Sequence, residues 1–138
     1  MNRLTGAMIK IADLRNVARE RLKDARALLK AGRYDGAIYM GGYVAEMALK
    51  CRICRTLKWL EFPETGGEFR NYLSLKTHDL SILRAFSGAE EAIKLKYALE
   101  WNSVSTWTPE LRYSSKSGTN KSDAECFVNS AATLLRFL

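Results

Sequence analysis

The segment 34–50 constrains the fold most, because it combines the periodicity of a long helix with a carboxylate in an apolar setting. Glu46 stands among the mainly apolar residues of positions 44–49. An ionised carboxylate is costly in such surroundings unless it is paired or hydrogen-bonded. Lys50 follows one turn later on the same helical face, so the sequence predicts a Glu46–Lys50 ion pair. We therefore expect an inner helix that carries a few fixed polar groups.

Two adjacent glycines, Gly41 and Gly42, lie in the middle of this predicted helix. A glycine in a helix interior costs about 1 kcal/mol relative to alanine. Their presence therefore needs a structural reason, and we expect them to let another backbone segment come close.

Apolar residues recur at helical spacing along most of the chain, and no segment shows sustained strand alternation. The pattern predicts helices over about residues 11–31, 35–58, 77–86, 89–104 and 122–138, with a short helical turn over 69–75. The predicted fold is all-α, an antiparallel up-and-down bundle of four long helices plus a short one. A chain of 138 residues suits a single domain over 1–138, with its core at about 11–138.

Local signals place the ends of several of these helices. Gly32 is expected to end the first helix, and Asp35 is expected to cap the second. The last helix is expected to open with a capping box at Ser122-Asp123-Ala124-Glu125.

The cysteine count and the hydropathy pattern indicate a cytoplasmic protein. Three cysteines argue against a disulfide framework and favour a reducing compartment. Neither a secretory signal nor an apolar run long enough to span a membrane is evident. Cys51 and Cys54, with His78 and Cys126, could form a zinc site, but a helical C-x-x-C without a second pair is a weak signal. Core cysteines, with no metal and no cofactor, are expected instead.

Positive charge is concentrated in the first part of the chain. Residues 1–58 hold 13 Lys/Arg and 5 Asp/Glu, a net charge of +8, whereas residues 59–138 carry −1. Such asymmetry suggests an anionic partner, although a solvated basic face is an equally open interpretation. The candidates for a nucleic-acid face are Arg15, Arg19, Arg26, Lys30, Arg33, Arg52, Arg55 and Lys58.

Four short motifs follow one another along the chain: Ala31-Gly32-Arg33-Tyr34-Asp35-Gly36-Ala37, Ala45-Glu46-Met47-Ala48-Leu49-Lys50, Thr77-His78-Asp79-Leu80 and Leu111-Arg112-Tyr113. In this order and rough spacing they resemble motifs of the HEPN domain, a helical bundle named for nucleotide binding in higher eukaryotes and prokaryotes. They are similar to its turn into the second helix, its alanine–glutamate…leucine–lysine core, its histidine–x–leucine helix start and its arginine–tyrosine motif. The chain has Ser114 where the family usually has proline.

The resemblance implies a four- to five-helix up-and-down bundle, often dimeric, that acts beside a small nucleotidyltransferase in prokaryotic toxin–antitoxin or stress systems. We accordingly expect a homodimer that binds a nucleotide or RNA. The expected ligand-binding residues are Glu46, Lys50, His78, Arg112 and Tyr113.

One large branch of that family cleaves RNA through an arginine followed, after four to six residues, by a histidine. His78 is the only histidine here, and the nearest upstream arginine, Arg70, lies eight positions before it. No histidine follows Arg112. Metal-free RNA cleavage needs an acid–base pair that typically includes a histidine. The sequence therefore favours a binding module over an enzyme, with no catalytic residue assigned.

Each candidate residue also has a structural interpretation. His78 could hold a phosphate or transfer a proton, or it could be hydrogen-bonded to backbone or to Glu46 at a helix start. Glu46 could be functional, or a buried structural partner of a nearby cation. Arg112 and Tyr113 could grip a phosphate and stack on a base, or they could anchor their loop.

The aromatic residues Tyr97, Trp101 and Trp107 could form an exposed stacking or dimer surface, or lie buried under the loop that follows. Two other functions stay open beside the binding module. One is a ribonuclease toxin with a non-standard active site, and the other is a dimeric protein-interaction adaptor that binds no nucleotide.

Overall fold

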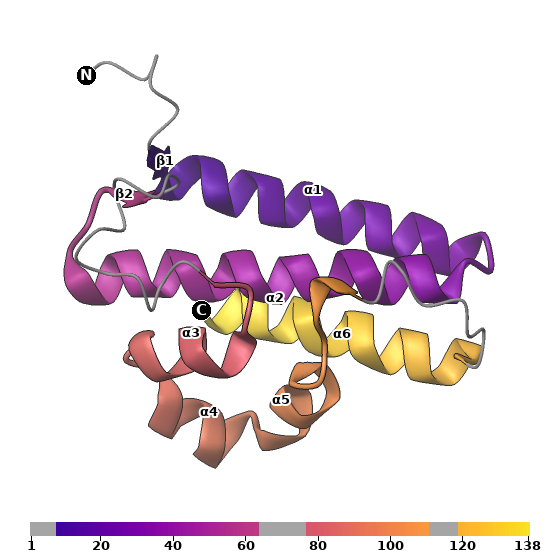
Figure 1. Cartoon of the computed structure of the whole chain (residues 1–138). Coiled ribbons are helices and arrows are strands. Elements are labelled where there is room, and N and C mark those ends of the chain that lie inside the picture. Colours follow the sequence, from indigo (N-terminus) through magenta and orange to yellow (C-terminus); the bar gives the residue numbers. More distant parts are fainter. Residues whose placement is uncertain (1–7, 64–76, 111–118) are drawn as a thin grey trace.

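The computed structural model describes residues 8–63, 77–110 and 119–138, which are mostly helical (Figure 1). The elements are β1 (Met8–Lys10), α1 (Ile11–Lys30), α2 (Tyr34–Leu57), β2 (Glu61–Pro63), α3 (Leu80–Phe86), α4 (Glu90–Lys96), α5 (Ala98–Val104) and α6 (Lys121–Phe137). The predicted all-α class is confirmed. The described part has three long helices and three short ones, rather than the four long helices expected. The helical turn predicted over 69–75 lies outside the described residues.

The two longest helices, α1 and α2, form an antiparallel hairpin joined by a short turn (Figure 1). Gly32 ends α1 as predicted, because its backbone adopts a φ of 75° that glycine tolerates best. The Gly32 amide donates to Leu29 at 3.1 Å and the Arg33 amide to Leu28 at 2.8 Å. These two bonds satisfy carbonyls at the helix end in a Schellman arrangement.

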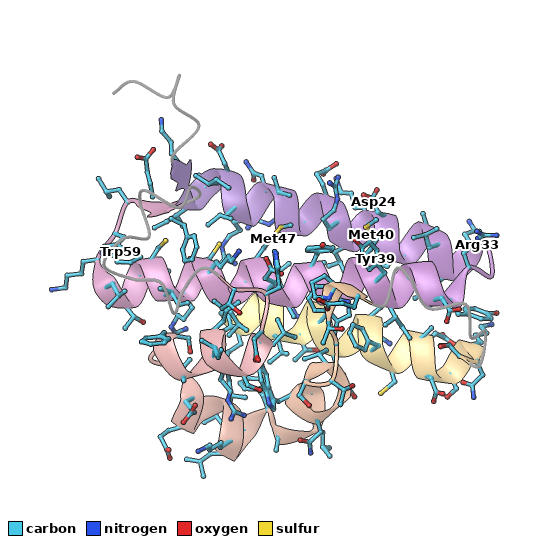
Figure 2. All side chains as sticks on the ribbon, in the orientation of Figure 1. Asp24, Arg33, Tyr39, Met40, Met47 and Trp59 are labelled. Carbon is cyan, nitrogen blue, oxygen red and sulfur yellow. The ribbon has the colours of Figure 1, made fainter. Side chains whose placement is uncertain are left out.

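Helix α2 is the central element, since α1, α3 and α6 all pack against it (Figure 1). Figure 2 shows Met40 and Met47 on its α1 side, and Arg33 and Trp59 at its opposite ends. Its buried positions are mainly small or aliphatic, and they include Ala37, Ala45, Ala48, Leu49 and Ile53. Small side chains allow neighbouring helices to come close, so the helix can be covered on several sides.

The two mid-helix glycines of α2 make room for aromatic side chains rather than for a backbone segment. A Cβ on Gly42 would lie 2.0–2.1 Å from atoms of the Trp107 indole. A Cβ on Gly41 would lie 3.1 Å from the Phe127 ring. The close approach expected from the sequence is therefore present, but its partners are side chains from the segment after α5 and from α6.

The helix predicted over 89–104 is divided into α4 and α5 at Tyr97. The backbone of Tyr97 leaves the helical region, with φ −128° and ψ 30°. Its ring lies 4.5 Å from that of Phe137 on α6, while Trp101 is buried and carries the Arg84 guanidinium 4.6 Å above its ring. The break lets these two aromatic residues reach different partners, which helical periodicity alone does not indicate.

Two predicted caps were wrong. Helix α2 begins at Tyr34, so Asp35 lies within its first turn and not at the cap. A carboxylate in that turn still suits the positive end of the helix dipole. At α6 the cap is Asn120, whose side-chain oxygen accepts from the Asp123 amide at 2.8 Å. Ser122 therefore sits one residue inside the helix instead of at its cap.

A two-stranded antiparallel ladder closes one end of the hairpin and was not predicted. Strands β1 and β2 pair with Ile9 opposite Phe62, and the Phe62 side chain is buried. Each strand has three residues, which is too short for sequence alternation to reveal. No helix in the described ranges is long and apolar enough to cross a membrane.

The contact between Gly42 and Trp107 generates a prediction. Gly42→Ala should lower the free energy of unfolding by about 2 kcal/mol, because the added methyl group overlaps the indole and must displace it. Urea unfolding of the purified protein, followed by tryptophan fluorescence, measures the change.

Gly36→Ala is the matched control on the same helix. Its Cβ would meet the Leu28 side chain at 3.4 Å, an ordinary contact distance. We expect it to be neutral or stabilising by up to about 1 kcal/mol. Equal stability of the two variants would show that Trp107 does not rest on Gly42.

Candidate functional site

A buried carboxylate shared by two basic side chains forms the centre of the candidate site. Glu46, on α2, is 3% exposed. One of its oxygens, Oε2, lies 2.9 Å from Lys50 Nζ, and the other, Oε1, lies 2.8 Å from His78 Nδ1. The predicted Glu46–Lys50 pair is confirmed, as is the structural interpretation of His78 as a partner of Glu46. Both carboxylate oxygens are thus satisfied, as a buried carboxylate requires.

The Glu46 contact determines which imidazole nitrogen faces outward. An ionised carboxylate only accepts hydrogen bonds, so Nδ1 of His78 donates to Glu46. Nε2 then faces away from Glu46, and the His78 side chain is 57% exposed. The site therefore presents one imidazole nitrogen whose orientation is set by a buried partner.

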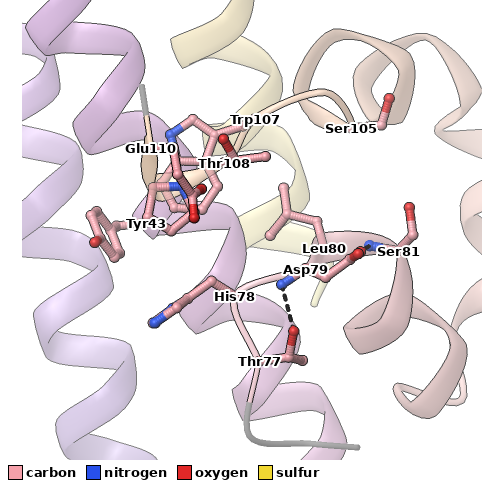
Figure 3. A pocket seen from close by; sticks show the side chains of 11 residues that line it. Tyr43, Thr77, His78, Asp79, Leu80, Ser81, Ser105, Trp107, Thr108 and Glu110 are labelled. Carbon is pink, nitrogen blue, oxygen red and sulfur yellow. Dashed lines mark hydrogen bonds between the residues drawn. The ribbon is translucent and has the colours of Figure 1, made fainter. Parts of the chain in front are cut away.

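The start of α3 positions His78. Asp79 caps this helix, and its Oδ1 accepts from the Ser81 amide at 2.9 Å and the Ile82 amide at 3.3 Å. The Thr77 hydroxyl accepts from the Asp79 amide at 2.9 Å (Figure 3). His78 is held between these two local motifs, so its backbone is fixed independently of Glu46. The prediction that Thr77-His78-Asp79 opens a helix is confirmed.

Lys50 is held below the surface by two contacts. Its ammonium group pairs with Glu46 and lies 5.2 Å from the centroid of the Phe62 ring. The Lys50 side chain is 17% exposed. A cation over an aromatic ring is stabilised by the ring quadrupole, so Lys50 acts mainly as a structural counter-ion of Glu46.

A pocket of about 690 Å³ opens beside His78 (Figure 3). Its lining comes from α2, the start of α3 and the segment after α5: Tyr43, Thr77, His78, Asp79, Leu80, Ser81, Ser105, Trp107, Thr108, Pro109 and Glu110. The volume lies in the range of small-molecule sites. Hydroxyl groups, two carboxylates and one imidazole give this pocket a polar character.

Aromatic rings form one wall of the pocket. The Tyr43 ring lies edge-on to Trp107, with centroids 5.0 Å apart, and to His78, with centroids 6.4 Å apart. Trp107 is buried, and among the described residues its indole N–H has no hydrogen-bond partner. The wall is a fixed aromatic surface, because Trp107 is seated directly on Gly42.

The five ligand-binding residues predicted from the sequence are only partly brought together. His78 lines the pocket, whereas Glu46 and Lys50 support it from α2 without lining it. Arg112 and Tyr113 lie outside the described residues. The sequence interpretation overlooked Tyr43, Thr108 and Glu110. The sequence feature that indicates this pocket is Gly42, which precedes Tyr43 and leaves the space that the Trp107 side chain fills.

Burial was the correct alternative for two of the three aromatic residues. Trp101 is 6% and Trp107 2% exposed, and both belong to the main core. Tyr97 is half-buried against Phe137. They therefore do not form the exposed stacking surface that the sequence left open.

The eight basic residues predicted as one face lie at different places along the hairpin. Arginine side chains near its β1–β2 end donate to backbone carbonyls at the end of α6 and just after it: Arg15 to Leu135, Arg52 to Phe137, and Arg55 to Leu138. Burial and the neighbouring Arg55 lower the pKa of Arg52. Arg26, Lys30 and Arg33 lie at the opposite end, beside the α1–α2 turn (Figure 1). Whether they contact nucleic acid stays a prediction.

The expectation of core cysteines is confirmed for Cys51 and Cys54 and is wrong for Cys126. Cys51 and Cys54 are buried in α2, whereas Cys126 is exposed on α6 and lies 3.3 Å from the Ser103 hydroxyl. Within the described ranges no three His, Cys, Asp or Glu side chains gather as metal ligands would. Burial raises the pKa of Cys51. Burial, with the neighbouring Cys51, raises that of Cys54 to about 12.

The comparison with known proteins gives one match. Residues 11–65 match the family model of the HEPN domain, which confirms the resemblance over α1, α2 and β2. The match includes the motifs at 31–37 and 45–50, while those at 77–80 and 111–113 lie beyond it. The chain matches no curated protein and no solved structure. The HEPN match supports, in general terms, a module connected with nucleotides or RNA.

The cysteine environments predict selective alkylation. In folded protein near neutral pH, iodoacetamide should modify Cys126 alone, because the thiolate is the reactive form and burial disfavours it at Cys51 and Cys54. Intact-mass spectrometry should therefore show one added group.

Cys126→Ser is the control, and it should take up no reagent until the protein is unfolded. Modification of Cys51 or Cys54 in the folded protein, as fast as that of Cys126, would contradict the burial of α2.

Proposed function

We propose that this chain is a HEPN-type module that binds a nucleotide or RNA at the Glu46–His78 site. The observation that carries the proposal is the 2.8 Å contact that holds the imidazole of His78 at the rim of an aromatic-walled pocket. Burying the carboxylate of Glu46 costs free energy, and a buried acid that only holds an exposed imidazole in place would give little in return. It is useful where the outward nitrogen must meet a ligand atom.

The pocket has the chemical groups that suit a nucleobase and its sugar. The half-buried Tyr43 lines the pocket and is backed by the buried Trp107, and bases stack on aromatic rings with little sequence preference. The Thr108 hydroxyl and the Glu110 carboxylate line the same pocket and can bind amino or hydroxyl groups. Arg112 and Tyr113 follow Glu110 closely in the sequence, and we propose that Arg112 binds the phosphate, since a guanidinium fork matches phosphate geometry.

We propose binding rather than cleavage. Among the described residues that line the pocket, the imidazole of His78 has no arginine or lysine beside it. Lys50, the nearest cation on α2, is already engaged by Glu46 and Phe62. The arginine that precedes a histidine by four to six residues in the ribonuclease branch of the family also has no counterpart here, because Arg70 lies eight positions before His78.

The biological setting is proposed from the family match alone. A HEPN-type module of this kind would act as a cytoplasmic homodimer beside a small nucleotidyltransferase, in a prokaryotic toxin–antitoxin or stress system. A dimeric adaptor that binds a protein and no nucleotide is the alternative, and the following experiment separates the two.

His78→Asn tests the site without removing its structural bond. The asparagine amide can still donate to Glu46 from the position of Nδ1, but the outward Nε2 is lost. Titration calorimetry with ATP, GTP, AMP and a short single-stranded RNA should find a ligand of the wild type whose affinity falls about tenfold in the variant. This loss corresponds to one hydrogen bond of about 1.4 kcal/mol.

Lys94→Gln, on the exposed part of α4, is the control and should bind as the wild type does. If none of the four ligands binds the wild type, the adaptor interpretation replaces the nucleotide-binding one. If a ligand binds His78→Asn with unchanged affinity, the pocket beside His78 is not its site.

A further inference from the structure

A second pocket lies at the other end of the hairpin. It has a volume of about 560 Å³ and is formed by the last turn of α1, the turn at 31–33 and the first turns of α6. Figure 1 shows the α1–α2 turn and the start of α6 at the same end of the molecule. The polar side chains that line it are Arg26, Lys30, Tyr34, Lys121, Glu125 and Asn129.

Three cations face this pocket, and none of them forms an ion pair with a described residue. Arg26 and Lys30 lie one turn apart on α1, and Lys121 comes from the first turn of α6. One carboxylate, Glu125, shares the pocket, which leaves a net charge of +2 among these side chains. Gathered like charges repel one another, and a bound anion would remove that cost.

Other cations on α1 form ion pairs, unlike Arg26 and Lys30. On α1, Arg21 pairs with Asp24 at 2.8 Å and Lys23 pairs with Glu20 at 2.9 Å. Arg26 and Lys30 have no such partners, because the sequence supplies no acidic residue three or four positions from either of them. The charge at this end of α1 is left available to a ligand.

Tyr34 separates this pocket from a neighbouring cavity of about 380 Å³. It lines both, together with Gly32, and Arg33 and Asp35 line the second. A Cβ on Gly32 would have no atom within 4 Å, so the space above the turn is open. A ligand held by the three cations would therefore meet an aromatic ring.

We propose that this pocket binds the phosphate chain of an oligophosphate anion. Three cations from two helices match a ligand with several adjacent negative charges better than they match a single carboxylate. The chain could be inorganic, or it could belong to a nucleoside polyphosphate whose base contacts Tyr34. Tyr34 and Glu46 are twelve residues apart on α2, about 18 Å along the helix. The site is thus separate from the pocket beside His78 and does not rest on the function proposed for it.

The test compares two double variants that remove the same charge. Lys30→Gln with Lys121→Gln alters the pocket, and Lys23→Gln with Lys94→Gln alters exposed lysines elsewhere. Titration calorimetry with sodium tripolyphosphate and with ATP measures the affinity of the full chain at fixed ionic strength. We expect the first pair to weaken tripolyphosphate binding at least tenfold and the second pair to change it less than twofold.

Three results would overturn the proposal. These are no binding of either probe to the wild type at millimolar concentration, an equal loss in both double variants, or an equal loss in His78→Asn. The second would show that the overall charge of the protein attracts the anion, and the third that the pocket beside His78 holds it.

Tyr34→Leu distinguishes the two sources of the phosphate chain. If ATP binding weakens while tripolyphosphate binding does not, the site is supported and its ligand is a nucleoside polyphosphate. If neither weakens, the site is supported and its ligand is an inorganic chain. If tripolyphosphate binding itself falls tenfold, the ring maintains the pocket rather than contacting a base, and the proposed base contact is wrong.

Discussion

The buried carboxylate of Glu46 is the constraint on which the rest of the site depends. A carboxylate that is 3% exposed must find partners for both oxygens, and it finds one on its own helix, Lys50, and one at the start of α3, His78. The second partner is distant in sequence, so this single charge ties the start of α3 to α2. Because His78 satisfies Glu46 through Nδ1, the same bond decides which nitrogen of the ring is presented outward. The same hydrogen bond therefore satisfies the buried carboxylate and orients the imidazole of the candidate site.

A second constraint is the missing side chain at Gly42. It lets the Trp107 indole rest on the backbone of α2 and brings the segment after α5 against the central helix. Tyr43, the next residue, then faces both Trp107 and His78. The pocket is therefore assembled from three parts of the chain around a site that a methyl group would block. This explains why a helix accepts a glycine that weakens it locally.

Local patterns in the sequence predicted those parts of the fold that depend on local chemistry. Gly32 ends α1, Lys50 pairs with Glu46 across one turn, and the apolar periodicity of α1, α2 and α6 locates three long helices. Two local predictions failed, since neither Asp35 nor Ser122 caps its helix, and the other failures involve contacts between distant segments. The break at Tyr97 depends on Phe137, some forty residues later, and the strand pair depends on β1 meeting β2 across the whole hairpin.

The pocket itself was only partly predictable, because Thr108 and Glu110 reach it through the packing of Trp107. Likewise, Lys121 joins Arg26 and Lys30 only because α6 begins beside the α1–α2 turn.

The tautomer of His78 shows directly whether Glu46 orients the imidazole ring. As the only histidine in the chain, it gives an unambiguous imidazole signal in a two-dimensional proton–nitrogen NMR spectrum. Above the pH at which the ring becomes neutral, we predict that Nδ1 carries the proton, because that nitrogen donates to Glu46, and that Nε2 carries the lone pair. A neutral ring protonated on Nε2, with the lone pair on Nδ1, would contradict it, since an ionised Glu46 could not accept a hydrogen bond from that form.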